Sequence, residues 1–199
     1  MAGPTIAELV IGDDPAAWQR LGFAVDGDHT VVGATTIVLD GAGGGLRSWA
    51  LDGASSTELD GLETVRSNAG QPAAREHPNG AVRIDHVVVN TPDLARTFAA
   101  LGEAGLDLRR VREHSETLHQ GFFRLGEVIL EVVGPPEPAG EEPARFWGVV
   151  AVVPDVDELV AGADPGLFGE PRAAVQQGRR IVTVAREAGL SVPLAFLTA

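Results

Sequence analysis

A motif that occurs twice in succession constrains the fold of this chain more than any other feature. The segment "RIDHVVVNTPDLARTFAAL" begins at Arg83 and the similar segment "RFWGVVAVVPDVDELVAGA" begins at Arg145. The two are offset by 62 residues, so that Asp93 in the first aligns with Asp155 in the second. Self-similarity at a fixed offset predicts two copies of one supersecondary unit.

Each copy shows the same order of predicted elements. A β-branched, extended run precedes a Pro-Asp turn, and Leu94, Phe98 and Leu101 then recur at helical spacing, with Gly105 suited to the helix end. Three strand-like runs follow in the first copy, "LDLRRVRE", "HQGFFRLG" and "VILEVVG". The second copy continues with "FGEPRAAVQ", "GRRIVTVA" and "VPLAFLTA". The pattern predicts tandem βαβββ modules and therefore the α+β class.

The modules have predictable boundaries. We expect the first full module over residues 81–136 and the second over 145–199, joined by the proline-rich "PPEPAGEEPA". Residues 1–62 read as an abbreviated unit of the same type, with an extra strand in "GGGLRSWALDG" and an extra helix in "STELDGL". Residues 63–80 are polar and contain proline and glycine, which indicates a surface linker.

The composition removes several kinds of chemistry. The chain contains no cysteine, no tyrosine and no lysine, which excludes thiolate nucleophiles, cysteine-ligated zinc, phenol acids and Schiff-base mechanisms. A net charge of −13 argues against nucleic acid or an anionic membrane as a partner. The start has no basic region typical of a signal peptide, and the apolar runs are strand-sized, so we expect a cytoplasmic protein.

Two polar residues lie inside apolar, strand-like runs. His86 interrupts "RIDHVVVN", where strand alternation would place it on one face with Ile84 and Val88. Glu131 interrupts "VILEVVG", and a carboxylate buried there needs a metal ion, an arginine or His86 as its partner. The simpler alternative for His86 is a hydrogen-bonded histidine in a half-buried strand.

The tandem units, with "IDHVVVNTPDL" opening one and "FFRLGEVILEVVGP" closing it, resemble the vicinal oxygen chelate superfamily. This superfamily includes glyoxalase I, bleomycin-resistance proteins, extradiol dioxygenases and methylmalonyl-CoA epimerase. The similarity is greatest to its glyoxalase-like domain proteins. It implies curved mixed sheets around a concave cleft, with metal ligands on the first and fourth strands of each module. His86 and Glu131 fall on those two positions.

The resemblance implies a divalent metal (Zn, Ni, Fe, Co or Mn) and no organic cofactor, but the second module departs from the pattern. Gly148 aligns with His86, and "VPLAFLT" offers no carboxylate, imidazole or amide. Two protein ligands would remain, whereas catalytic metals are usually held by at least three protein groups. Glu8 is a candidate third ligand if the N-terminal unit packs against the first full module, and His119 is another.

Further residues are candidates for contact with a substrate. A guanidinium matches a carboxylate in geometry, so Arg124 is a candidate clamp, although it could equally pair with Glu131 or face solvent. Phe122 and Trp147 are candidates for the cleft wall. Glu131 is also the candidate catalytic group, as a proton shuttle.

Three functions are compatible with this pattern. The first is a glyoxalase-like enzyme, a metal-dependent lyase or isomerase, or a dioxygenase with iron, acting on a small vicinal-oxygen substrate at His86 and Glu131. The second is a metal-free small-molecule binding protein of the bleomycin-resistance type. The third is an inactive scaffold whose modules serve for dimerisation. A small-molecule ligand is the expected partner in the first two, and a homodimer is compatible with all three.

Overall fold

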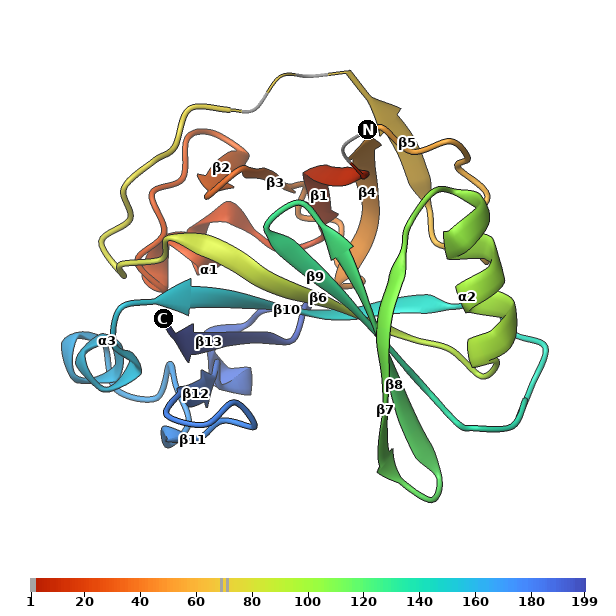
Figure 1. Cartoon of the computed structure of the whole chain (residues 1–199). Helices are drawn as coiled ribbons and strands as arrows, with labels where there is room; N and C mark the ends of the chain where they lie inside the picture. Colours follow the sequence, from red (N-terminus) through yellow and green to blue (C-terminus); the bar gives the residue numbers. More distant parts are fainter. Residues whose placement is uncertain (1–2, 69, 71) are drawn as a thin grey trace.

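The computed structural model describes residues 3–68, 70 and 72–199, which form two β-sheets (Figure 1). The smaller sheet has five strands in the order β2-β3-β1-β4-β5. Its strands are β1 (Thr5–Ile11), β2 (His29–Val32), β3 (Thr35–Leu39), β4 (Leu46–Asp52) and β5 (Thr64–Ser67). It is built from the N-terminal part of the chain, and β5 falls in the range expected to be linker.

The larger sheet has eight strands in the order β11-β12-β13-β10-β6-β9-β8-β7. The first module contributes β6 (Arg83–Asn90), β7 (Leu108–Ser115), β8 (Leu118–Leu125) and β9 (Val128–Gly134), and the second contributes β10 (Arg145–Val153), β11 (Arg172–Ala173), β12 (Arg180–Thr183) and β13 (Leu194–Thr198). The opening strands β6 and β10 pair antiparallel at the centre. The predicted tandem βαβββ arrangement is therefore confirmed.

Equivalent aspartates begin the helices of the two modules. Asp93 accepts a hydrogen bond from the backbone N–H of Arg96 at the start of α2 (Leu94–Glu103). Asp155 accepts one from the N–H of Asp157 at the start of α3 (Val156–Gly162). Both bonds satisfy donors that a helix N-terminus otherwise leaves unpaired. The remaining helical elements are α1 (Pro15–Arg20) and the 3₁₀ turn η1 (Arg186–Ala188).

The hydrophobic core lies between the two sheets. Leu9 and Trp49 from the small sheet belong to the same buried cluster as Val87, Val89 and Leu130 from the large one. Aromatic rings bridge the two sheets, with Trp49 5.1 Å from Phe146 between ring centroids. Because this core covers one face of the eight-stranded sheet, a ligand site on this sheet must use its other face.

The helix expected over residues 56–62 is not formed, and that prediction is wrong. Asp60 and Gly61 have positive φ values of 52° and 83°, which a right-handed helix does not allow. The Asp60 carboxylate instead accepts hydrogen bonds from Arg96 and Thr97 of α2. The loop therefore ties the N-terminal unit to the first module.

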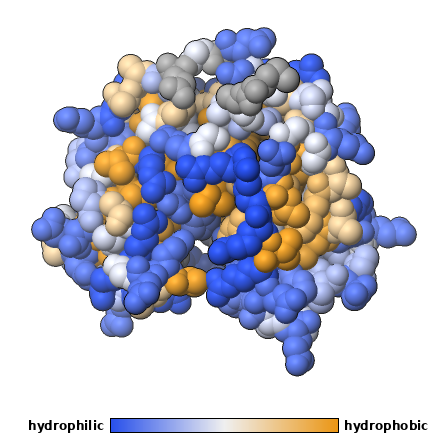
Figure 2. Space-filling model, in the orientation of Figure 1, coloured by the Kyte–Doolittle hydropathy of each residue, from blue (hydrophilic) through white to orange (hydrophobic). Residues whose placement is uncertain are grey.

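Hydrophilic residues cover most of the face seen in Figure 2, with separate apolar patches between them. A solvated surface of this kind agrees with the net charge of −13. Among the helices of the described residues, none is long and apolar enough to span a bilayer.

Candidate ligand-binding site

An irregularity in the central strand pair sets the position of His86. His86 pairs with Val150 of β10, but the next paired residue is Ile84, so Asp85 is bulged out of register. Ile84 lies in the core, on the opposite face from His86 and Val88. The prediction that Ile84 shares a face with His86 is therefore wrong, because the bulge breaks the alternation of side chains.

The bulge also brings Asp85 and His86 into contact although they are neighbours in the sequence. Nδ1 of His86 lies 3.0 Å from Oδ2 of Asp85. An ionised carboxylate has no proton to give, so the imidazole Nδ1–H donates this bond. The arrangement fixes the orientation of the ring and leaves Nε2 as the nitrogen available for other contacts.

Nε2 of His86 points towards Glu131. The strands β6 and β9 run parallel as neighbours, with Glu131 in register with Val88, and Nε2 of His86 lies 3.7 Å from Oε2 of Glu131. Each of the two side chains is 16% exposed. The structure thus brings the two candidate residues together at the middle of the eight-stranded sheet.

Asp85, which holds His86, is itself surrounded by cationic side chains. Its side chain is 6% exposed, and Oδ1 lies 3.1 Å from an Arg83 nitrogen and 3.5 Å from an Arg179 nitrogen. Burial by itself would raise the pKa of the Asp85 carboxyl. The hydrogen bond and charge of His86, together with Arg83, outweigh that effect and hold the pKa below its usual value. Asp85 is therefore ionised wherever the protein is folded near neutral pH.

Gln120 of β8 holds the other oxygen of Glu131. Its Nε2 donates to Oε1 of Glu131 over 2.6 Å. Its own Oε1 is buried and has no hydrogen-bond partner among the described residues. Glu131 therefore has one oxygen fixed by an amide and the other turned towards His86.

His86 and Glu131 line a cleft of about 560 Å³ on the face of the sheet opposite the core. Its walls are mainly apolar and come from both modules: Val88, Leu118, Val133, Trp147, Val149, Val150, Ile181, Pro193, Leu194 and Ala195. Its polar groups are His86, Asn90, Glu131, Arg172 and Thr183. An apolar cavity of this size with a few convergent polar groups is typical of a small-molecule site.

The three residues expected to contact a substrate differ in their placement. Trp147 lines the cleft and is 52% exposed. Phe122 pairs with Glu131 across β8 and β9 but lies under the Arg110 guanidinium, 4.9 Å from ring centroid to Cζ. Arg124 is exposed and donates to the carbonyl of Gly126 over 2.6 Å, so neither of these two lines the cleft.

The proposed third ligands do not lie at the cleft. Glu8 is on β1 of the five-stranded sheet, paired with Thr36 and Ala50, and the core separates that sheet from the cleft. The expectation that packing of the N-terminal unit brings Glu8 to His86 fails because the unit covers the opposite face. His119 alternates with Gln120 along β8 and so points away from the Glu131 side.

The second module supplies no replacement ligand. A Cβ at Gly148 would lie 2.8 Å from the carbonyl oxygen of Pro193, so this position has no room for a side chain. Among the residues that the structure describes, no three His, Cys, Asp or Glu side chains form a metal-binding group. His86 and Glu131 are one donor short of the three that catalytic metals usually have, so the donor set does not fit such a metal.

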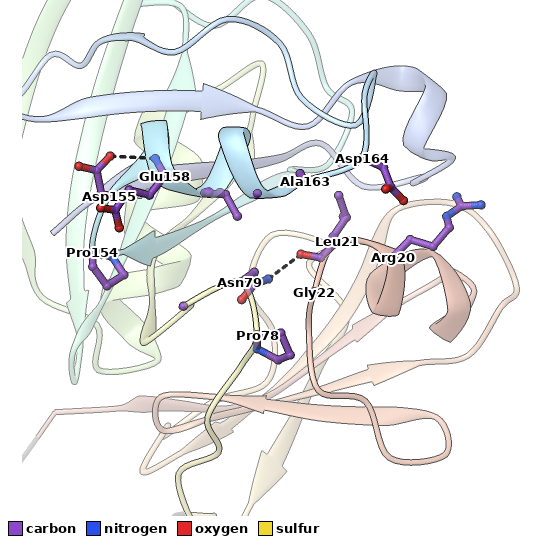
Figure 3. A pocket seen from close by; sticks show the side chains of 13 residues that line it. Arg20, Leu21, Gly22, Pro78, Asn79, Pro154, Asp155, Glu158, Ala163 and Asp164 are labelled. Atoms are coloured by element: carbon purple, nitrogen blue, oxygen red, sulfur yellow. Dashed lines mark hydrogen bonds between the residues drawn. The ribbon is translucent and has the colours of Figure 1, made fainter.

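A second cavity, of about 460 Å³, lies between the end of α1, the turn at residues 78–80 and α3 (Figure 3). Several of its polar groups are already bound within the fold. Asn79 donates to the carbonyl of Leu21, Asp155 caps α3 and Arg20 donates to the carbonyl of Ala188. We therefore assign this cavity to the junction of the N-terminal unit and the second module.

Sequence reasoning missed Asp85, Gln120, Arg172 and Arg179. Asp85 could have been predicted from the sequence. An aspartate and a histidine side by side inside an apolar run both need a polar partner, and each can be the partner of the other. No local pattern marks the other three, because their roles depend on which strands become neighbours in the folded sheet.

Comparison with solved structures decides the fold. A variant of 4-hydroxymandelate synthase from Streptomyces coelicolor superposes with a TM-score of 0.63, covering 99% of this chain and 93% of that chain at 13% identity. The chain has the vicinal oxygen chelate fold. The resemblance inferred from the sequence is therefore confirmed for the fold. Because the sequence identity is so low, the confirmation does not extend to activity.

Other proteins with the vicinal oxygen chelate fold cover less of the chain. Methylmalonyl-CoA epimerase from Mycobacterium tuberculosis covers 60% of this chain and 89% of that chain, with a TM-score of 0.46 and 12% identity. A variant of the Streptomyces coelicolor epimerase, in complex with 2-nitronate-propionyl-CoA, covers 60% and 98%, with a TM-score of 0.44 and 19% identity. No family model matches the sequence, and no curated protein matches it.

Proposed function

We propose that this chain binds a small, oxygen-containing organic molecule in the cleft of the eight-stranded sheet, with His86 and Glu131 as its polar contacts and no resident metal. The observation that carries the proposal is the 3.7 Å pair of Nε2 and Oε2 at the floor of a largely apolar cleft of about 560 Å³. Placing polar groups on an otherwise apolar face costs free energy of desolvation, and a role in ligand binding would account for their presence there.

The contacts around the pair support a binding role. Asp85 orients the imidazole and Gln120 orients the carboxylate, so both groups are held before a ligand arrives. Pre-organisation of this kind reduces the entropy lost on binding. Trp147 and the apolar residues of β10 and β13 give the ligand body a wall to pack against.

The test uses phenylacetamide, an apolar ring with one carboxamide, as an uncharged probe. We expect it to raise the melting temperature of the protein, and His86→Leu to abolish that rise. His119→Leu, on the other face of the sheet, is the matched control and should keep it. Zinc, nickel and manganese salts should leave the melting temperature unchanged. A rise with a metal that His86→Leu removes would overturn the metal-free assignment.

A second function, proton transfer, is favoured by the Asp85–His86 contact. An imidazole whose Nδ1–H is held by a carboxylate presents Nε2 as an acid or base, and Glu131 stands beside it. On a neutral ketone such as phenylacetone, Glu131 would take an α-proton to leave an enolate. The proton on its carboxyl would exchange with solvent D₂O, and Glu131 would then return a deuteron to the carbon.

Proton NMR of phenylacetone in D₂O tests this second function. We expect the α-proton signal to disappear with the wild type, at a rate that Glu131→Gln lowers by about a hundredfold. Glu113→Gln, at an exposed position of β7, is the control and should exchange the α-proton like the wild type. Equal rates in the wild type and Glu131→Gln would restrict the protein to binding alone.

A further inference from the structure

Arg172 is a cation at the cleft whose side chain has no partner among the residues that the structure describes. Of the chain's arginines, all of which lie in the described residues, most bind a carboxylate, a carbonyl oxygen or an aromatic ring. The exceptions among these described side chains are Arg112, Arg145, Arg172 and Arg186. Only Arg172 of these four lines the cleft.

The position of Arg172 sets it apart from the His86–Glu131 pair. It lies on β11, the edge strand of the second module, and pairs with Ile181, whose side chain also lines the cleft. The strands β12, β13 and β10 stand between β11 and β6. At about 4.8 Å per interval, this spacing places Arg172 at the rim and the polar pair near the centre of the sheet. Apart from Thr183, the cleft-lining residues on these three intervening strands are apolar.

We propose that Arg172 anchors the carboxylate of the ligand, so that the natural ligand is a monocarboxylic acid with an apolar or aromatic body. This inference rests on the proposed function of the same cleft. The carboxylate binds the guanidinium at the rim, the body packs against Trp147 and Leu194, and a further oxygen or acidic C–H of the ligand meets His86 and Glu131. Arg172 takes the role that the sequence assigned to Arg124, whose guanidinium is turned to Gly126.

The charges favour a single carboxylate over a phosphorylated ligand. Arg172 can pair with the single charge of a monoanion, and the described residues that line the cleft include no second arginine for a further charge. The whole chain carries a net charge of −13, and its field repels a polyanion more strongly than a monoanion.

Phenylacetate and phenylacetamide, which have nearly the same shape and differ in charge, separate this inference from the proposed function. Titration followed by NMR gives the dissociation constant of each with the wild type, Arg172→Gln and Arg186→Gln. We expect phenylacetate to bind the wild type about tenfold more tightly than phenylacetamide, an advantage that Arg172→Gln removes and Arg186→Gln retains. The advantage should also shrink as salt is added, since Arg172 is exposed.

Other results would overturn either the carboxylate anchor or the proposed function of the cleft. Equal affinity of the wild type for the two probes, or an unchanged phenylacetate affinity in Arg172→Gln, would overturn the carboxylate anchor and leave the cleft as a ligand site. Failure of both probes to bind the wild type would overturn the proposed function itself. Preference for phenyl phosphate over phenylacetate would replace the carboxylate by a phosphate as the recognised group and also overturn the inference.

Discussion

Nε2 of His86 and Oε2 of Glu131 lie 3.7 Å apart, although a helix and two strands separate the residues along the chain. Parallel pairing of the first and last strands of one module produces this proximity. The pair lies on the face of the sheet that the core does not cover, within a cleft whose walls come from both modules. We therefore expect a ligand in the cleft to contact both side chains.

Glu131→Gln should weaken ligand binding without unfolding the protein. The amide keeps the volume of the side chain, and Glu131 is partly exposed, so we expect a change of less than about 1 kcal/mol in the free energy of unfolding. The affinity for phenylacetamide should fall by about tenfold because an oriented charged acceptor is lost. Urea unfolding and NMR titration measure the two effects, with Glu113→Gln as the control. A variant that loses stability but keeps its affinity would contradict the assignment.

Asp85→Asn should be far more damaging to the fold than a similar change at the surface. Asp85 is buried with Arg83, Arg179 and His86 around it, and its replacement leaves these donors without their charged partner. We expect a loss of roughly 1–3 kcal/mol in the free energy of unfolding. Asp157→Asn, which breaks the exposed pair with Arg180, should cost less than about 1 kcal/mol. Urea denaturation measures both changes. Similar losses in the free energy of unfolding for the two variants would show that the buried contacts of Asp85 stabilise the fold no more than an exposed ion pair does.

Gly148→Ala tests why the second module has no ligand at the position equivalent to His86. The added methyl group would meet the backbone of Pro193, and the resulting overpacking should lower the free energy of unfolding by about 1–3 kcal/mol. Gly102→Ala in α2, where a Cβ meets nothing within 4 Å, is the matched control. It should raise stability by about 0.5–1 kcal/mol through the helix propensity of alanine. An unchanged free energy of unfolding in Gly148→Ala would mean that β10 and the segment at Pro193 can move apart to admit a side chain.

His77 should make the fold sensitive to mild acid. The imidazole is buried, accepts a hydrogen bond from the N–H of Ala24 at Nδ1 and donates from Nε2 to the carbonyl of Val31. Burial disfavours the charged ring and holds the pKa of His77 below its ordinary value of 6.5, although the Val31 bond opposes this. Between that lowered value and 6.5 the unfolded chain binds more protons than the native one.

Stability is therefore predicted to fall as the pH drops below about 6.5 towards the native pKa of His77. Urea unfolding at several pH values, compared between the wild type and His77→Gln, isolates the contribution of this residue. The variant should be less stable at high pH and should lose less stability than the wild type on acidification. Parallel pH profiles for the two proteins would rule out His77 as the cause.

Much of the fold follows from local patterns in the sequence. The repeated Pro-Asp segments mark the two helix caps at Asp93 and Asp155, and β-branched runs mark the central strands. The expected helix over residues 56–62 failed because Asp60 finds its partners on α2, a contact between distant segments that no local propensity contains. Which face of the large sheet the N-terminal strands cover could not be predicted, because it depends on how the two sheets pack.

The candidate site was only partly predictable for the same reason. Alternation along a strand correctly predicted that Val88 shares a face with His86. It wrongly predicted the same for Ile84, because nothing in "RIDH" indicates the bulge at Asp85. Gln120 and Arg172 acquire their roles from neighbours on other strands, Glu131 and Ile181. Such cross-strand pairs are set by register over the whole sheet rather than by sequence spacing.

The most direct test of the central claim is to map, by ¹⁵N–¹H NMR, which backbone amides shift when phenylacetamide or phenylacetate is added. We expect the shifts to be concentrated around His86, Val149 and Leu194, which line the cleft from three strands. His86→Leu should suppress them. Shifts confined to the second cavity, around Leu21, Asn79 and Leu159, would contradict the claim, as would spectra that neither probe changes.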